Sequence, residues 1–253
     1  GDPRCGEKFA SQISQAVESL KSKNQKLCAF IAETFPSVGG QIITPKGYLD
    51  EVYKLIRKQG GLCIADEVQT GLGRLGDYYF GFEYQKVCPD IVVLGKPIGN
   101  GHPIGVVATT EKIANSFDNG IEFFSTFGGS TLSCAIAKEV IEIVDQEGLQ
   151  SNAQEMGIKL KKRLINLQEK YQFIGDVRGM GLFVGIEFID KTGKENTRLC
   201  TFVKNRMREY RILVGSEGPK DNVLKIRPPL SIEADDIDMI IETLDIILAE
   251  VDL

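Results

Sequence analysis

Asp90-Ile91-Val92-Val93-Leu94-Gly95-Lys96 is an apolar run that ends on a single lysine. Earlier in the chain, Leu62-Cys63-Ile64-Ala65-Asp66 is a similar run that ends on a carboxylate. Short apolar runs between helical patterns predict buried strands of a parallel sheet. In such sheets ligands bind beyond the carboxyl ends of the strands, so we expect Lys96 and Asp66 to lie at one edge of the sheet.

The surrounding sequence continues this alternation of strands and helices. A helix is expected over residues 8–23, a strand over 27–33, a helix from Pro45 to Gln59, and a strand over 104–109. The pattern predicts an α/β fold with a mainly parallel sheet.

The character of the chain changes after about residue 150. Helical periodicity covers residues 129–170 and is followed by expected strands at 173–178 and 182–188, then a helix at 197–209. Short strands are expected at 212–214 and 223–226, and a last helix after Ser231, whose first turn is acidic. We therefore expect residues 1–149 to be part of a large domain and residues 150–253 to form a small α+β domain.

Composition excludes several classes of protein. The 253 residues carry a net charge of −5, so the chain has no basic field for nucleic acid or anionic lipid. No apolar stretch approaches the roughly 20 residues that span a bilayer, and no signal peptide is visible. The six cysteines form no Cys-x-x-Cys pair, and Cys28 and Cys63 are expected inside apolar strands. We expect no metal site and no disulfide framework, and a reducing, cytoplasmic setting.

The lysine and the aspartate together indicate one kind of cofactor. Pyridoxal phosphate needs an amine for its aldehyde and a carboxylate for its ring nitrogen. Gly95 and Gly99 leave room for a planar ligand beside Lys96, and burial of that amine is expected to lower its pKa. Gln69 is placed to hydrogen-bond the phenolic oxygen of the ring. From spacing alone, a buried structural ion pair between Lys96 and Asp66 remains an alternative.

Three blocks of sequence carry a resemblance to a known family. Ile64 to Gly71, Gly95 to Gly101 and Ser125 to Gly129 resemble the signature blocks of class III aminotransferases, which are fold-type I pyridoxal-phosphate enzymes. The resemblance implies that Lys96 bonds to the cofactor and moves the proton at the amine-bearing carbon. It also implies that Asp66 pairs with the pyridine nitrogen, that Val68 packs on the ring and that Gln69 contacts its phenolic oxygen. Thr126 would contact cofactor phosphate across a homodimer interface.

Within that family, the chain is most similar to phospho-lyases of ethanolamine phosphate or phosphohydroxylysine. The blocks that resemble them are Gly39 to Ile43, Gly99 to Pro103 and Asn222 to Pro229. Lys225 stands where aminotransferases often place an arginine for a substrate carboxylate, and Val38 where they often place its glutamate partner. Lysine cannot make the bidentate contact of arginine, and Arg227 is a second candidate for binding a substrate anion. The alternative for Lys225 and Arg227 is a solvated strand edge.

The resemblance implies an enzyme that eliminates phosphate from a small phosphorylated amine bound to pyridoxal 5'-phosphate. The alternatives are a transaminase that transfers the amino group to a keto acid, and a non-catalytic module for dimerisation or regulation. Members of this family are normally longer, so we expect the amino-terminal half of the cofactor site to be missing from this chain. Alone, the chain is then expected to be inactive and to bind the cofactor weakly. A nucleotide-binding Rossmann domain is not favoured, because the first strand lacks the Gly-x-Gly-x-x-Gly turn.

Two further features of the sequence have either a functional or a purely structural interpretation. His102 is the only histidine, and we expect it to shape a loop or pair locally rather than act as a general base. The segment from Gly215 to Pro219 is expected to be a loop that either cradles phosphate or is an ordinary turn.

Overall fold

The computed structural model describes residues 4–251 and divides the chain into two compact units. The first unit comprises residues up to 34, residues 44–72 and residues 80–146. The second comprises residues 35–43, residues 73–79 and the chain from residue 147 onward. Two short segments from the first half of the sequence therefore belong to the second unit.

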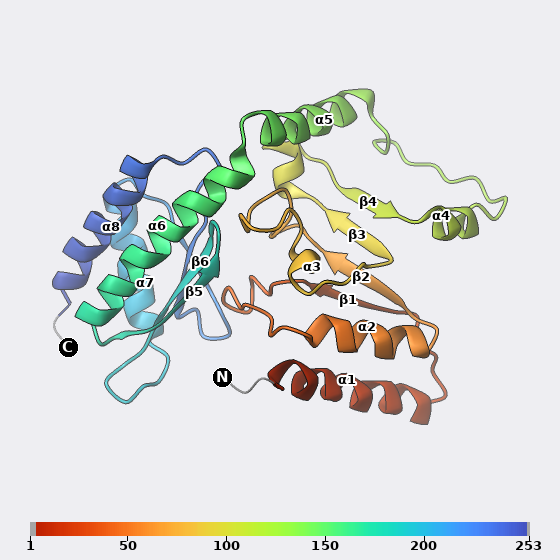
Figure 1. Ribbon diagram of the computed structural model, residues 1–253, viewed down its shortest axis with the longest axis horizontal. Coiled ribbons are helices and arrows are strands. Elements are labelled where there is room, and N and C mark those ends of the chain that lie inside the picture. The colour runs from red at the N-terminus through yellow and green to blue at the C-terminus, as the bar shows by residue number, and fades with distance from the viewer. Residues whose placement is uncertain (1–3, 252–253) are drawn as a thin grey trace. The chain divides into compact units, whose positions relative to one another are not determined.

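The first unit is built on a four-stranded sheet (Figure 1). Its strands are β1 (Ala29–Glu33), β2 (Leu62–Asp66), β3 (Ile91–Leu94) and β4 (Val106–Thr109), in that spatial order. β1, β2 and β3 are parallel, whereas β4 runs antiparallel to β3. The prediction of a mainly parallel sheet is confirmed.

Helices precede, connect and follow these strands. They are α1 (Cys5–Ser22), α2 (Tyr48–Lys58), the single-turn α3 (Gly81–Tyr84), the 3-10 turn η1 (Lys96–Gly99), α4 (Glu111–Phe117) and α5 (Thr131–Gln146). Figure 1 shows α1 and α2 side by side along the sheet. The apolar face of α2 and Ala10 of α1 bury themselves against Cys63 of β2. Burial of this face, rather than helix propensity, is the main reason that α2 is stable.

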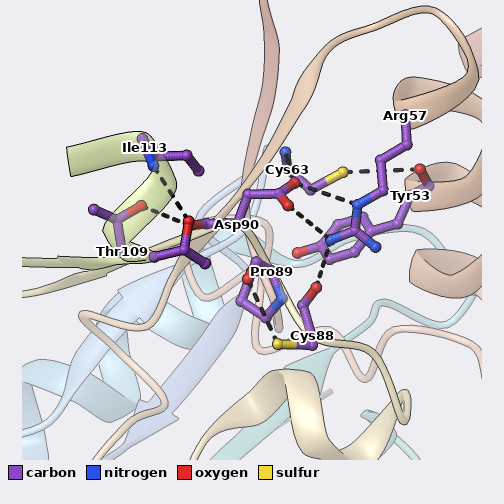
Figure 2. Close-up of polar contacts among 9 residues, drawn as sticks. Tyr53, Arg57, Cys63, Cys88, Pro89, Asp90, Thr109 and Ile113 are labelled. Carbon is purple, nitrogen blue, oxygen red and sulfur yellow. Dashed lines mark hydrogen bonds and ion pairs between the residues drawn. The ribbon is translucent and has the colours of Figure 1, made fainter. Parts of the chain in front are cut away.

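Asp90 immediately precedes β3 and fixes the strands at the end opposite to Asp66. Figure 2 shows its contacts. Its carboxylate accepts hydrogen bonds from the main-chain nitrogen of Cys63, at 2.8 Å, and from Nη2 of Arg57, at 3.2 Å. The Arg57 guanidinium also lies over the ring of Tyr53, 5.4 Å from its centroid, and donates to the Cys88 carbonyl. One carboxylate thus ties α2, β2 and the start of β3 together and holds the two strands in register.

The second unit contains a four-stranded antiparallel sheet with helices on one face. Its helices are α6 (Leu149–Lys170), α7 (Thr197–Glu209) and α8 (Ala234–Ala249), and its strands are β5 (Ile174–Met180), β6 (Phe183–Phe188), β7 (Gly215–Glu217) and β8 (Val223–Ile226). The strand order is β5-β6-β8-β7. Alternate residues of β6 and β8, among them Ile186 and Leu224, pack against all three helices in one core. The predicted α+β character of this part of the chain is confirmed.

Some local expectations were wrong. The strand expected at 212–214 lies instead at Gly215–Glu217, because the main chain of Ile212 is used to end α7: its nitrogen bonds to the Met207 carbonyl after Arg211 adopts a left-handed conformation with φ of 65°. The helix expected to begin at Pro45 begins at Tyr48. Cys63 is buried in β2 as expected, but Cys28 precedes β1 and is exposed. Among residues 4–251, none of the helices combines the length and apolar character needed to cross a membrane.

Candidate active site

Asp66 is the last residue of β2, at the carboxyl edge of the parallel strands. Its Oδ1 accepts a hydrogen bond from the main-chain nitrogen of Val68 at 3.0 Å, and the side chain is only partly buried. This contact closes a tight turn after the strand and fixes the orientation of the carboxylate. A negative group is thereby held at the edge of the sheet where ligands bind in such folds.

Lys96 begins η1, directly beyond the end of β3. Its φ is +38°, an uncommon value for a residue with a side chain, and Asn100 closes the turn in the left-handed region as well. Buried Ile98 anchors the turn from within. The expectation that Lys96 is buried among the strands was wrong: η1 starts where the sheet ends, and the lysine side chain is exposed.

The turn after β2 and the turn after β3 lie side by side. Asp66 pairs with Val93 in the sheet register, and the main-chain nitrogen of Glu67 donates to the Val93 carbonyl at 3.0 Å. A β-carbon placed on Gly95 would lie 3.4 Å from Cγ2 of Val68, an ordinary contact distance, so the two turns are immediate neighbours. Within residues 4–251, Asp66 and Lys96 form no ion pair with each other, so the alternative of a structural Lys–Asp pair is not what the structure shows.

Glu67, which sequence reasoning overlooked, is completely buried beside this site. Its Oε2 accepts from the Gly81 nitrogen at 2.8 Å and from the Thr70 hydroxyl, and its Oε1 accepts from the Phe82 nitrogen at 2.9 Å. Burial raises the pKa of Glu67 more than these hydrogen bonds lower it. Glu67 therefore holds the start of α3 against the turn that carries Asp66 and Gln69, and this is a structural task.

The remaining predicted cofactor residues differ in burial and lie in two separate segments. Gln69 is buried and Val68 is partly buried, both in the turn after β2. Thr126 is exposed in the segment between α4 and α5. Its neighbours Phe124 and Phe127 are 79% and 86% exposed. The roles assigned to these residues stay predictions.

His102 pairs locally, as expected from the structural interpretation of this residue. Its Nε2 lies 2.8 Å from the hydroxyl of Ser133 on α5, and its main-chain nitrogen donates to the Gly99 carbonyl at 2.9 Å. The imidazole thus links the Lys96 turn to α5. Beside it runs a groove of about 830 Å³, lined among others by Val107, Phe127 and Leu132.

In the second unit, the two predicted anion-binding residues belong to the region of β8. Lys225 lies on β8, which is an inner strand between β6 and β7, so the alternative of a solvated strand edge was wrong. The Lys225 ammonium lies 2.6 Å from Oε1 of Glu217 on β7. The expectation of a loop from Gly215 to Pro219 was also wrong for its first three residues, which form β7. Arg227 follows β8 and is partly buried.

Arg74 is a second residue that sequence reasoning overlooked. Its guanidinium donates to the carbonyls of Leu182 and Pro228. Burial lowers the pKa of Arg74 to about 10, and the nearby charge of Arg227 adds to this effect. Two guanidinium groups therefore lie close together in the second unit. No periodicity or spacing in the sequence pairs residue 74 with residue 227.

Comparison with known proteins gives one family. The sequence model described as aminotransferase class-III matches residues 4–248. A protein of Drosophila melanogaster named alanine–glyoxylate aminotransferase 2-like is 45% identical over 241 residues, which are 94% of this chain and 49% of that protein. A protein of Caenorhabditis elegans named ethanolamine-phosphate phospho-lyase homolog 1 is 38% identical over 250 residues, covering 96% of this chain and 53% of that protein.

Comparison of structures leads to the same group of proteins. A phospholyase from Arthrobacter, solved in complex with phosphoethanolamine, superposes with a TM-score of 0.94 at 36% identity, over 98% of this chain and 59% of that chain. The chain spans about half the length of the curated relatives it matches.

Proposed function

Since this chain belongs to the class III aminotransferase family, we propose that the complete protein is a pyridoxal-phosphate-dependent enzyme that releases phosphate from a small phosphorylated amine. One observation carries the proposal of cofactor chemistry. The carboxylate-bearing turn after β2 and the lysine-bearing turn after β3 adjoin at the carboxyl edge of the sheet.

The residues at this edge fit pyridoxal 5'-phosphate. When bound, that cofactor withdraws electrons from the carbon next to the substrate nitrogen and so makes its proton removable. The exposed amine of Lys96 is free to bond to an aldehyde and to accept that proton at Nζ. Asp66, held by the Val68 nitrogen, would keep the ring nitrogen protonated. Val68 would cover one ring face, and Gln69 would contact the phenolic oxygen.

The identity of the reaction depends on the substrate. After Lys96 has taken the proton, a substrate that carries phosphate on the next carbon can expel the phosphate. A substrate without a leaving group there transfers its amino group to a keto acid instead. Two observations support the lyase. By the family resemblance, Lys225 stands where many aminotransferases place an arginine that binds a carboxylate, and the chain is similar to named phospho-lyases. Similarity to a protein named as an aminotransferase favours transamination as the second candidate.

The experiment that separates the two uses the complete protein loaded with cofactor. Ethanolamine phosphate and phosphohydroxylysine are offered with and without a keto acid, and inorganic phosphate and amino-group transfer are both measured. Phosphate release that needs no keto acid supports the lyase. Turnover that occurs only with a keto acid shows a transaminase. No turnover of either kind in a protein that binds the cofactor would support a non-catalytic module.

We also propose that the complete protein is a homodimer, in which Thr126 of the partner subunit contacts the cofactor phosphate. The support is the exposed aromatic segment around Thr126 together with the apolar groove beside it, since contiguous exposed apolar surface of this kind marks an interface. Phe124→Ser is expected to raise the dimer dissociation constant at least about tenfold. Sedimentation equilibrium measures this, and an unchanged constant would contradict the proposal.

The length of the relatives supports a further proposal. This chain covers about half of each, so we infer that another segment of the parent protein supplies further cofactor contacts. The isolated chain is then expected to bind pyridoxal phosphate weakly. Stoichiometric binding by the isolated chain, seen as a visible absorbance that borohydride fixes, would refute this.

A reducing compartment such as the cytoplasm is proposed from the cysteines. All six lie in the described part of the chain, and each has a free thiol. Fractionation of cells that express the complete protein tests this.

A further inference from the structure

Lys225 occupies a position on its sheet that has a glycine on each flanking strand. In the register of the sheet it lies directly opposite Gly185 on β6 and Gly215 on β7. Neither neighbour has a side chain, so nothing from the two flanking strands covers the lysine at its own level. Residues directly opposite in a sheet normally pack on each other, and here the lysine side chain has no such partner.

The face of the sheet that carries Lys225 is not the face that packs on the helices. Ile186, Leu224 and Ile226 point into the helical core, and the residues that alternate with them point the other way. The segment 35–43 lies over this second face. An added β-carbon on Gly185 would come within 2.9 Å of Cβ of Gln41, and the Gly218 nitrogen donates to the Val38 carbonyl at 3.0 Å.

On this covered face, Glu217 neutralises Lys225. The Lys225 ammonium and Oε1 of Glu217 are 2.6 Å apart, and their side chains are only 17% and 21% exposed. In the described part of the chain, Glu217 is the only side chain that bonds to the Lys225 ammonium. Val38 stands where, by the family resemblance, aminotransferases often have a glutamate. Its carbonyl accepts from the nitrogen of Gly218, the residue after Glu217. The acidic partner of Lys225 therefore comes from β7 and not from residue 38.

We propose that Glu217 sets the anion specificity of the substrate site by competing with the substrate for Lys225. The inference rests on the proposed function, because it names the substrate group that Lys225 receives. A tethered carboxylate has a high effective concentration at the ammonium, so a substrate carboxylate of equal charge gains little by displacing it. A phosphate group carries about −1.5 to −2 charges at neutral pH and has three acceptor oxygens, and it therefore competes better. The pair thus favours phosphorylated amines over amines that carry a carboxylate.

The test uses the complete protein with its cofactor, as Glu217→Gln, Lys225→Gln and the double variant. Binding of inorganic phosphate and of acetate is measured by calorimetry, and KM is measured for ethanolamine phosphate. Removing the competing charge in Glu217→Gln is expected to strengthen binding of both anions, with acetate gaining more, by about fivefold. Lys225→Gln is expected to weaken phosphate binding by a similar factor. In the Lys225→Gln background, Glu217→Gln is expected to have no further effect.

Glu187→Gln is the matched control, because Glu187 is a carboxylate on the same face, paired with Arg178 at 2.5 Å. It should leave anion binding unchanged, and thermal melting of every variant monitors folding. The proposal is overturned if Glu217→Gln leaves both affinities unchanged, or alters them equally with and without Lys225, or is matched by Glu187→Gln. Phosphate binding needs no turnover. If anion binding changes in the variants at residues 217 and 225 but the protein releases no phosphate from its substrate, the proposed lyase activity is wrong and the proposed anion site is supported.

Discussion

Asp66 and Glu67 are adjacent in the chain, yet their carboxylates occupy opposite environments. The Asp66 carboxylate is partly exposed and accepts from the Val68 nitrogen. The Glu67 carboxylate is completely buried and accepts from the main-chain nitrogens of Gly81 and Phe82. Burial alternates along β2 and continues into Glu67 just beyond the strand, and this separates a carboxylate that can serve chemistry from one that holds the fold.

Glu67→Gln is expected to destabilise the protein by about 1–3 kcal/mol. The amide that replaces one carboxylate oxygen cannot accept from a main-chain nitrogen, so a buried donor of Gly81 or Phe82 loses its partner. The midpoint of urea unfolding measures the loss. A variant as stable as the parent would show that this buried carboxylate does not hold α3.

Asp66→Asn is expected to leave stability nearly unchanged and to weaken cofactor binding. Asparagine keeps an oxygen that accepts from the Val68 nitrogen, so the free energy of unfolding should change by less than about 0.5 kcal/mol. The negative charge needed at the pyridine nitrogen is lost, and cofactor affinity should fall about 10- to 100-fold. Spectroscopic titration with pyridoxal phosphate checks this. If cofactor affinity is unchanged, the proposed role of Asp66 is wrong.

Lys96→Gln is expected to abolish activity without unfolding the protein. The side chain is exposed and forms no ion pair or hydrogen bond within the described residues, and glutamine, like lysine, is not branched at the β-carbon and so suits the positive φ no worse. Loss of the group that moves the proton should lower kcat by at least about 10²- to 10⁴-fold. The visible absorbance that borohydride fixes should disappear as well. A Lys112→Gln variant, changed at an exposed lysine of α4, controls for loss of charge.

The strand ends of the first unit could be predicted because they depend on local pattern. Apolar runs ending at Asp66 and Lys96 specify buried strands, and parallel pairing then brings their carboxyl ends to one edge. The exposure of Lys96 could not be predicted, because it depends on the chain leaving the sheet through η1 at once. The apolar run before Lys96 indicated a buried strand, but it did not show that the strand ends at Leu94.

The pairing of Lys225 with Glu217 was beyond sequence reasoning for a different reason. It depends on the register between β7 and β8, and the strand that carries Glu217 was expected three residues earlier. Ile212 and Val214 have strand-like side chains, but the main-chain nitrogen of Ile212 bonds to the Met207 carbonyl at the end of α7. Tertiary pairing between β7 and β8 thus determines both the position of β7 and the ion pair between Lys225 and Glu217.

The buried thiols of Cys63 and Cys200 are expected to resist alkylation. Burial raises the pKa of Cys63 to about 11 and that of Cys200 to about 12. A raised pKa means that the folded protein keeps each proton as pH rises above 9.0, the ordinary value, while the unfolded chain loses it. The contribution of these neutral thiols to stability is therefore present below pH 9.0 and is lost as pH rises toward 11 and 12.

Iodoacetamide labelling at about pH 8, followed by peptide mass spectrometry, measures this. In the folded protein both residues should remain unlabelled, and in urea both should react. Equal rates in the two conditions would contradict the burial of these thiols.

Gly157→Ala is expected to destabilise the second unit, although alanine favours helices by about 1 kcal/mol over glycine. Gly157 lies where α6 crosses the turn between β5 and β6, and an added β-carbon would lie 2.3 Å from the Gly181 carbonyl oxygen. Gly181 cannot yield easily, because its φ is +52° and its own α-carbon faces the main chain of Leu75. Separation of the helix from the turn should cost about 1–3 kcal/mol net. Ser151→Ala, an exposed change on the same helix, should stay within about 0.5 kcal/mol of the parent. If thermal unfolding shows Gly157→Ala to be as stable as Ser151→Ala, then α6 does not pack this closely on the turn.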